Sequence, residues 1–253
     1  MNRQAMMAGA AAIVVMMMGC GNSNNPVGPA AGDTPVPGPA TGTVVFSEGF
    51  GGDLSKWDAQ YMINVGDFYP HMTITTAAAH TGTHSITGDS TRCALQYSLA
   101  QADRIEAGVA GVQFYVMATA KGHANFTVRF GQNAGSSGGL GHAFGMGFDK
   151  SDSVTCTLYD YMAMTARQDS AIAPMQLNHW YKCVIEVDFA AAQITYSLDG
   201  QVVRHCPLPT ADWYGIDRLL VFRGTNPEDL AGGTDSLTGP RPYYADDLVL
   251  YKK

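Results

Sequence analysis

Three segments of the sequence place polar side chains at alternate positions, a pattern that could assemble a site for an acidic sugar. In "NFTVRFG" these side chains are Asn125, Thr127 and Arg129, and the residues between them are apolar. Successive side chains of a β-strand point to opposite faces, so the three polar groups are expected on one face. An arginine pairs with a carboxylate through two parallel hydrogen bonds. The segment is therefore a candidate for holding the carboxylate of a sugar acid.

Two further segments and one histidine extend this candidate site. "TLYDYMA" places Tyr159 and Tyr161 at alternate positions, "VQFYVM" does the same for Gln113 and Tyr115, and His142 follows the flexible stretch "GSSGGLG". If these segments lie in one concave sheet they line a groove for a polysaccharide, because aromatic rings stack on the faces of sugars. The expected ligand-binding residues are then Gln113, Tyr115, Asn125, Arg129, Tyr159 and Tyr161.

The same groups could also catalyse a reaction. β-Elimination on a uronate-containing glycan needs a group that neutralises the carboxylate, a base for the adjacent proton and an acid for the leaving oxygen. The candidates for these roles are Arg129, His142, Tyr159 and Tyr161. The alternative is that these side chains form the solvated outer face of an antiparallel sheet, where Tyr, Thr and Arg are common.

Short runs rich in β-branched and aromatic residues must position these side chains. They follow one another from about Thr43, most with period-two alternation, and Gly, Asn, Asp or Pro separates them. Asp199-Gly200 is a preferred pair for a two-residue hairpin turn, since both positions need positive φ. Only "SLAQADRIEAG" is expected to form a short helix. The pattern predicts an all-β fold, a two-sheet antiparallel jelly-roll sandwich over residues 43–253.

The first 42 residues are expected to export and tether this domain. Arg3 precedes an apolar run, Ala5 to Met18, that is too short to span a bilayer comfortably and is typical of a signal peptide. The run leads into "MMGC", which resembles a bacterial lipoprotein box. Residues 1–19 are then removed and Cys20 carries the lipid; an ordinary secretory signal is the alternative. Residues 20–42 have the composition of a flexible Pro/Gly linker, and the Gly after Cys20 favours an outer-membrane or cell-surface location.

Composition and charge limit the partners. Fifteen Lys and Arg against 22 Asp and Glu give a net charge of −7, and no basic cluster is present. This argues against nucleic acid, whose phosphates need clustered cations. Membrane contact is expected through the lipid anchor only, and the protein is expected to be a monomer.

Four cysteines remain after Cys20, and in an oxidising compartment they predict two disulfides of open connectivity or, alternatively, buried free thiols: Cys93, Cys156, Cys183 and Cys206.

Four motifs, in order along the chain, resemble the concanavalin A-like lectin/glucanase superfamily. They are "FSEGFGGDLSKW", "AHTGTHSITGD", the hairpin "NHWYKCVIEVDFAAAQITYSLDGQVV" and the closing "YYADDLVLYKK". The resemblance implies a jelly roll, polysaccharide lyase-like or LamG-like, that handles carbohydrate. Glucanases of the superfamily carry Glu-x-Asp-x-x-Glu on one strand. That motif is absent here, and the nearest pair, Glu186 and Asp188, lies on the hairpin strand, so retaining glycoside hydrolysis is not expected. Polysaccharide lyases share the fold, but their Arg-x-Glu-x-Arg and Gln-x-His motifs are also absent.

The resemblance further implies a structural Ca²⁺ where the first and last strands meet. Glu48 and Asp246 are the matching ligands, with Asp247 beside them. The glutamate of the family usually falls one residue later, and a one-residue slip on a strand reverses the face of a side chain. The alternative is that these are surface acids that blunt edge strands. His80 and His84, in a Gly/Thr-rich turn, are expected to form hydrogen bonds within a loop rather than to bind metal.

The sequence therefore predicts a cell-surface lipoprotein that binds a carbohydrate polymer through the concave face of a jelly roll. Two other functions stay open. One is a polysaccharide lyase acting on a uronate-containing glycan. The other is a non-catalytic envelope or adhesion protein with no sugar ligand.

Overall fold

The computed structural model describes residues 41–58, 72–88, 93–121, 125–133, 140–149, 151–160, 165–209, 215–224 and 243–253. The expected signal peptide, Cys20, nearly all of the linker and Tyr161 lie outside these ranges. The side chains of Cys93, His142 and Tyr159 are likewise outside the description, although the backbone of each is placed in a strand. Among the described residues, no helix has the length and hydrophobicity that crossing a bilayer requires.

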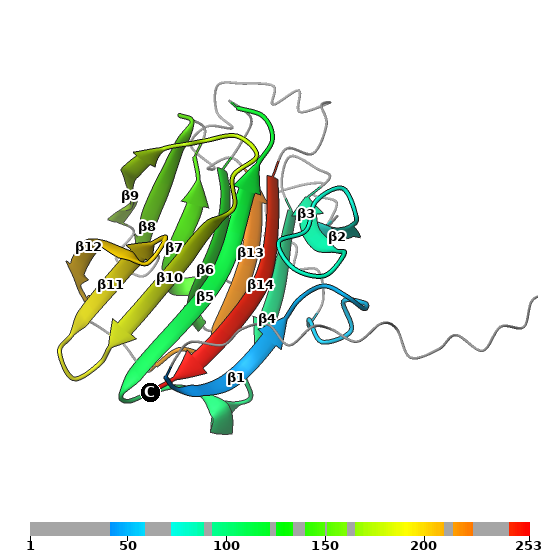
Figure 1. The fold of residues 1–253 in the computed structure, drawn as a ribbon. Coiled ribbons are helices and arrows are strands. Elements are labelled where there is room, and N and C mark those ends of the chain that lie inside the picture. Colours follow the sequence, from blue (N-terminus) through cyan, green and yellow to red (C-terminus); the bar gives the residue numbers. More distant parts are fainter. Residues whose placement is uncertain are drawn as a thin grey trace, which may run out of the picture.

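The first and last strands of the chain lie in the same layer, an eight-stranded sheet (Figure 1). Its order is β12-β11-β10-β5-β14-β3-β2, and β1 also pairs with β14. These strands are β1 (Thr43–Glu48), β2 (Met72–Thr75), β3 (Ser85–Gly88), β5 (Val109–Ala118), β10 (Tyr181–Asp188), β11 (Gln193–Leu198), β12 (Gln201–Pro207) and β14 (Tyr243–Lys252).

The second layer is a six-stranded sheet of order β4-β13-β6-β7-β8-β9. Its strands are β4 (Cys93–Ser98), β6 (Asn125–Asn133), β7 (Leu140–Phe148), β8 (Ser153–Asp160), β9 (Thr165–Pro174) and β13 (Arg218–Gly224). All neighbouring strands in both sheets run antiparallel. The predicted all-β sandwich of two antiparallel sheets is confirmed.

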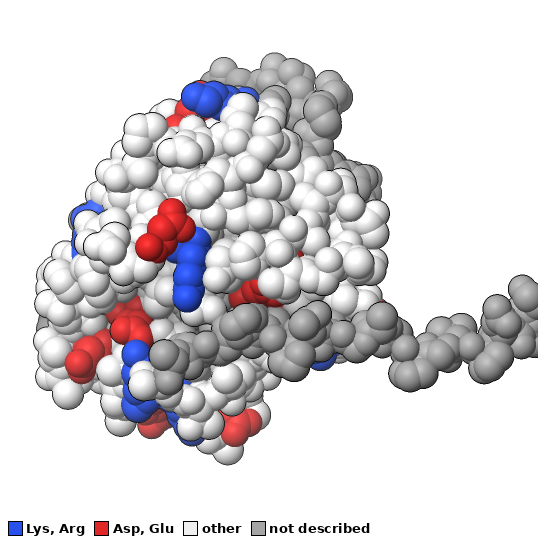
Figure 2. Space-filling model, in the orientation of Figure 1, with Lys and Arg blue, Asp and Glu red and all other residues white. Residues whose placement is uncertain are grey.

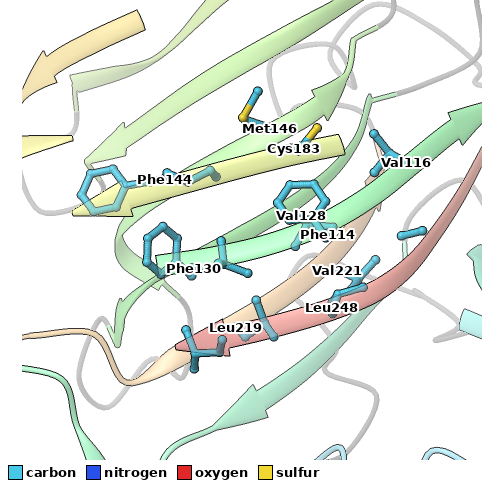
Figure 3. Close-up of a cluster of buried hydrophobic side chains, with 14 of the residues drawn as sticks. Phe114, Val116, Val128, Phe130, Phe144, Met146, Cys183, Leu219, Val221 and Leu248 are labelled. Carbon is cyan, nitrogen blue, oxygen red and sulfur yellow. The ribbon is translucent and has the colours of Figure 1, made fainter. Parts of the chain in front are cut away.

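The core lies between the two sheets because one side of each strand is apolar. Strand β10 shows the pattern most simply, with buried and half-buried residues in strict alternation. Burying a large apolar side chain contributes roughly 1.5–3 kcal/mol, so the many phenylalanines of the core dominate its stability. Figure 3 shows side chains from both sheets meeting there, among them Phe114, Val116, Cys183 and Leu248 from one sheet and Val128, Phe130, Phe144, Met146, Leu219 and Val221 from the other.

The predicted hairpin turn and short helix are both located. Asp199 and Gly200 have φ of 49° and 81°, and they join β11 to β12 by the two-residue turn that the sequence predicts. The stretch expected to be helical forms a single 3₁₀ turn over Gln101–Asp103.

Candidate functional site

The outer face of the six-stranded sheet carries the polar residues of β6. Phe126 and Val128 are fully buried in the core between the sheets. Thr127 and Arg129 alternate with them and therefore lie on the opposite face, away from the eight-stranded sheet. Asn125 occupies the same alternate set, and all three polar residues are buried.

Arg129 is held in place by two neighbours on this face. Its Nε donates a hydrogen bond to Thr127 Oγ1 at 2.9 Å, and its guanidinium carbon lies 4.5 Å from the centroid of the Phe222 ring. Phe222 belongs to β13 and pairs directly with Thr127. A desolvated guanidinium over an aromatic ring gains on the order of 2 kcal/mol. The residue is 9% exposed, so a ligand could touch only a small part of it.

Gly145 makes room for Arg129 on the other side. It lies opposite Arg129 on β7, and a Cβ atom at this position would be 2.8 Å from Arg129 Cγ. Since real Cβ atoms essentially never come closer than 3.0 Å to a neighbour, a side chain here would push Arg129 away. The glycine is thus part of what positions the guanidinium.

The register of β7 and β8 separates two of the residues expected beside Arg129. Thr157 pairs with Gly145, and Tyr159 follows two positions along β8, in the same alternate set as Arg129. His142 pairs with Gln132 and belongs to the other alternate set. The prediction that His142 joins Arg129 on one face is therefore not supported by the register.

Gln113 and Tyr115 do not share a groove with Arg129. Both lie on β5 of the eight-stranded sheet, on the side opposite the core residues Val112 and Phe114. The outer faces of the two sheets look away from each other, so the single groove predicted from the sequence is wrong. Alternation along a strand predicts which residues share a face, but it does not predict which of the two sheets contains the strand.

A second polar cluster lies where β14 bulges beside β5 and β3. The pairing of β14 with β5 shifts between Asp246 and Val249, and Asp247 has φ of 51°. Both aspartates are fully buried. Burial is the largest cause that raises the pKa of Asp246, to about 7, while a hydrogen bond from the backbone N–H of His80 opposes it.

The side chain of His80 covers these aspartates on the outer face of the sheet. Its Nδ1 lies 2.6 Å from Asp247 Oδ2, so this loop histidine forms a hydrogen bond to β14 rather than within its own loop. The imidazole stacks on the ring of Tyr115 with centroids 3.5 Å apart, and Trp180 lies edge-on at 5.8 Å. Burial, followed by the charge of Asp247, raises the pKa of Tyr115.

Glu48 lies on the other face of the same sheet. It pairs with Leu248, and Phe46 two residues before it pairs with Leu250, so the register places Glu48 on the core side. Its Oε1 accepts a hydrogen bond from the backbone N–H of Phe50 at 2.8 Å, and Lys56 Nζ is 3.7 Å from Oε2. Asp246 pairs with Tyr115 on the outer side. The one-residue offset seen in the sequence therefore separates the glutamate from the two aspartates.

These positions do not fit the calcium site that the resemblance implies. Within the described part of the chain, no group of three or more His, Cys, Asp or Glu side chains is arranged to hold a metal ion. Calcium takes six to eight oxygen ligands, and the oxygens of the aspartates already accept hydrogen bonds. Calcium binding by Glu48, Asp246 and Asp247 stays an untested prediction.

The other acidic pair noted in the sequence, Glu186 and Asp188, is on β10 of the eight-stranded sheet. Glu186 Oε1 accepts hydrogen bonds from the Tyr251 hydroxyl and from Lys253 Nζ, each at 2.6 Å. The pair is thus on the opposite face of the sandwich from Arg129.

The three cysteines whose side chains are described, Cys156, Cys183 and Cys206, are free thiols buried in the core. The two predicted disulfides are therefore not formed among them, and the alternative of buried thiols describes them better. Burial is the largest cause that raises the pKa of Cys156 and of Cys183.

Two antiparallel sheets packed face to face, with the first and last strands paired in one of them, define a concanavalin A-like jelly roll. Solved structures with this fold are similar over most of the chain. An endo-β-1,4-glucuronan lyase from the fungus Trichoderma reesei is 14% identical with a TM-score of 0.55, covering 83% of this chain and 96% of the lyase. The calreticulin globular domain of T. cruzi is 12% identical with a TM-score of 0.58, covering 83% and 88%.

A carbohydrate esterase from the Shiga toxin-encoding bacteriophage phi24B is 14% identical with a TM-score of 0.55, covering 84% of this chain and all of the esterase. No protein-family model matches the sequence, and no curated protein sequence matches it either. At these identities the similarity shows the fold alone. This fold has relatives that bind or process carbohydrates.

Sequence reasoning missed the residues that position the site. Phe222 lies on β13, far from β6 in sequence, and Gly145 lies on the next strand, β7. Only the strand pairing reveals that both lie beside Arg129. One signal was present in "FGMGF", where glycines alternate with large apolar residues. Such alternation indicates a strand that has no side chains on one face, so that another group can pack closely against its backbone.

Proposed function

We propose that this domain binds a carbohydrate polymer with acidic sugars through the outer face of the six-stranded sheet, at Arg129. The observation that carries the proposal is the preorganised guanidinium, fixed by Thr127 Oγ1 and the Phe222 ring and given room by Gly145. A fixed guanidinium loses little entropy on pairing with a carboxylate, which is the group that distinguishes an acidic glycan from a neutral one. The lipid anchor expected at Cys20 would present this face at the cell surface.

Affinity electrophoresis tests the proposal. The protein is run in gels that contain alginate, glucuronan or a neutral glucan, and only the acidic polymers are expected to retard it. Arg129→Ala should weaken binding by roughly tenfold or more, because a charged hydrogen-bonding pair contributes about 1.5–3 kcal/mol. Arg129→Lys keeps the charge but not the planar guanidinium, so its binding should be intermediate.

Arg104→Ala is the matched control. Arg104 lies outside β6, next to the 3₁₀ turn, where it pairs with Glu106 and Asp217, so its removal changes the net charge equally but leaves the contacts of Arg129 with Thr127 and Phe222 in place. Equal retardation of the wild type and Arg129→Ala would overturn the proposal. Absence of retardation by every glycan would favour an envelope or adhesion protein without a sugar ligand.

β-Elimination on the same face is a second candidate function. The specific observation is the register, which places Tyr159 two positions beyond Thr157 in the alternate set of Arg129. A base removes the proton next to the uronate carboxylate, the electron pair forms a carbon–carbon double bond, and the bond to the leaving oxygen breaks as that oxygen takes a proton. Arg129 would stabilise the charge on the carboxylate and Tyr159 would transfer a proton.

Ultraviolet absorbance of the unsaturated chain ends tests this candidate. Incubation with glucuronan or alginate should raise the absorbance, and Tyr159→Phe should abolish the rise while retardation in the gel persists. A flat absorbance with the wild type, together with retained binding, would leave binding as the only function of the face.

A further inference from the structure

Two buried carboxylates next to each other in sequence need compensation from the rest of the protein. Asp246 and Asp247 are both fully buried at the bulge of β14. An ionised carboxylate that leaves water without partners costs several kcal/mol, so such groups bind a metal ion or accept hydrogen bonds. The group that compensates these two carboxylates decides whether the bulge of β14 needs a bound metal ion.

The loop between β2 and β3, which lies beside β14, supplies hydrogen-bond donors to both aspartates (Figure 1). Asp247 Oδ1 accepts from the Thr81 hydroxyl and Oδ2 from His80 Nδ1, each at 2.6 Å. Asp246 Oδ2 accepts from the backbone N–H groups of His80 at 2.8 Å and Thr81 at 3.3 Å, and Oδ1 accepts from the N–H of Asp247 at 2.8 Å. Every carboxylate oxygen of the pair therefore has a donor.

The imidazole is fixed in this position from its other sides. It stacks on Tyr115 at a centroid distance of 3.5 Å and meets Trp180 edge-on, and 27% of the side chain stays exposed. The loop itself closes through the Ser85 hydroxyl, which donates to the carbonyl of Ala78 at 2.6 Å. The donors are thus held in place by a structured loop.

The donors lie where a cation would have to bind. A Ca²⁺ ion next to Asp246 and Asp247 would have to displace the hydrogens of His80 and Thr81, and Glu48 is on the opposite face of the sheet. We propose that His80 and Thr81 take the place of the metal ion, so that a hydrogen-bonded histidine locks the β2–β3 loop to β14 and this junction is independent of calcium.

Thermal unfolding of the whole protein in calcium and in EDTA is the first test. The wild type is expected to unfold at the same temperature in both. His80→Ala should lower Tm by at least about 4 °C, because it removes a hydrogen bond to a buried charge. His84→Ala is the matched control, since His84 contacts the Thr83 hydroxyl in the exposed part of the same loop, and its Tm should stay at the wild-type value.

Two further measurements keep the test decisive if His80→Ala fails to fold. Thr81→Val removes the hydroxyl donor with little change of volume and should also lower Tm. Thr81→Ser keeps the hydroxyl and should unfold at the wild-type Tm. Terbium luminescence reports a calcium-type site directly, since the nearby Trp180 would sensitise a bound ion, and no signal is expected. A calcium-dependent rise in the wild-type Tm, a terbium signal that Asp247→Asn abolishes, or equal Tm values for Thr81→Val and Thr81→Ser would overturn the proposal.

Discussion

A buried guanidinium needs compensating contacts, and Arg129 obtains them from its own strand and from two others. Thr127 lies on its own strand, Phe222 is on β13, and Gly145 is on β7. Replacing any of these three residues would change the position of the Arg129 guanidinium in the protein without ligand. At the scale of single residues, the proposed site is therefore a matter of positioning as much as of residue type.

Gly145→Ala tests that positioning. The added Cβ would be 2.8 Å from Arg129 Cγ, so the arginine must move, and overpacking of this kind costs about 1–3 kcal/mol of stability. Retardation by acidic glycans should weaken together with the loss of stability. Gly52→Ala is the control, since nothing lies within 4 Å of a Cβ at Gly52, and it should change neither quantity. Unchanged glycan binding in Gly145→Ala would show that the position of Arg129 does not matter.

The three free thiols give a second prediction at this scale. Cys156, Cys183 and Cys206 are buried, and burial raises the pKa of Cys156 and Cys183, so little thiolate is exposed at neutral pH. Iodoacetamide should therefore label none of the three in the native protein and all of them in urea, as peptide mass spectrometry would record. Disulfide-linked peptides that contain these cysteines would restore the disulfide prediction made from the four cysteines that follow Cys20.

At the scale of elements, the β11–β12 hairpin depends on its two-residue turn. Both Asp199 and Gly200 have positive φ, and Asp199 Oδ1 also accepts a hydrogen bond from the backbone N–H of Lys182 at 2.8 Å. Gly200→Ala should lower the free energy of unfolding by about 1–2 kcal/mol, because a side chain disfavours the left-handed conformation. Asp199→Asn, which retains the acceptor and tolerates this conformation, should unfold like the wild type in urea. A neutral Gly200→Ala would contradict the assigned turn.

Local signals predicted this hairpin and the alternation of β6, and the family resemblance implied that the first and last strands meet. They did not predict β3 and β4, which are short, or β9, whose sequence mixes polar and apolar residues without regular alternation. They also failed to predict that β5 and β6 belong to different sheets, although the two strands follow one another in the chain. Alternation indicates which side chains of a strand share a face. The sheet to which β5 belongs depends instead on its pairing with β10 and β14, which are distant in sequence.

The position of Glu48 shows the same limit in one residue. Its sequence context resembles a calcium ligand, but a shift of one position places it on the core side of the sheet. There the carboxylate binds the N–H of Phe50 instead of joining Asp246. The period of two along a strand makes such one-residue differences decisive.

At the scale of the whole molecule, charge does not indicate a nucleic-acid partner. The net charge is −7, and the face shown in Figure 2 is mostly neither acidic nor basic, with the charged side chains in small scattered groups. A polymer of like sign would be repelled at long range, so binding of an acidic glycan has to come from a local contact such as Arg129. Retardation by alginate should consequently persist at moderate salt, since a mostly buried guanidinium is screened less than an exposed one. Complete loss of retardation at low millimolar salt would argue for non-specific attraction.

Hydrogen exchange in the presence of the polysaccharide tests most directly where this protein meets its ligand. The amides of β6, β7 and β13, which surround Arg129, are expected to exchange more slowly when glucuronan or alginate is added, while those of β10, β11 and β12 keep their rates. Slower exchange confined to the eight-stranded sheet, or no change at any strand under conditions where the gel shows binding, would contradict the assignment of the outer face of the six-stranded sheet.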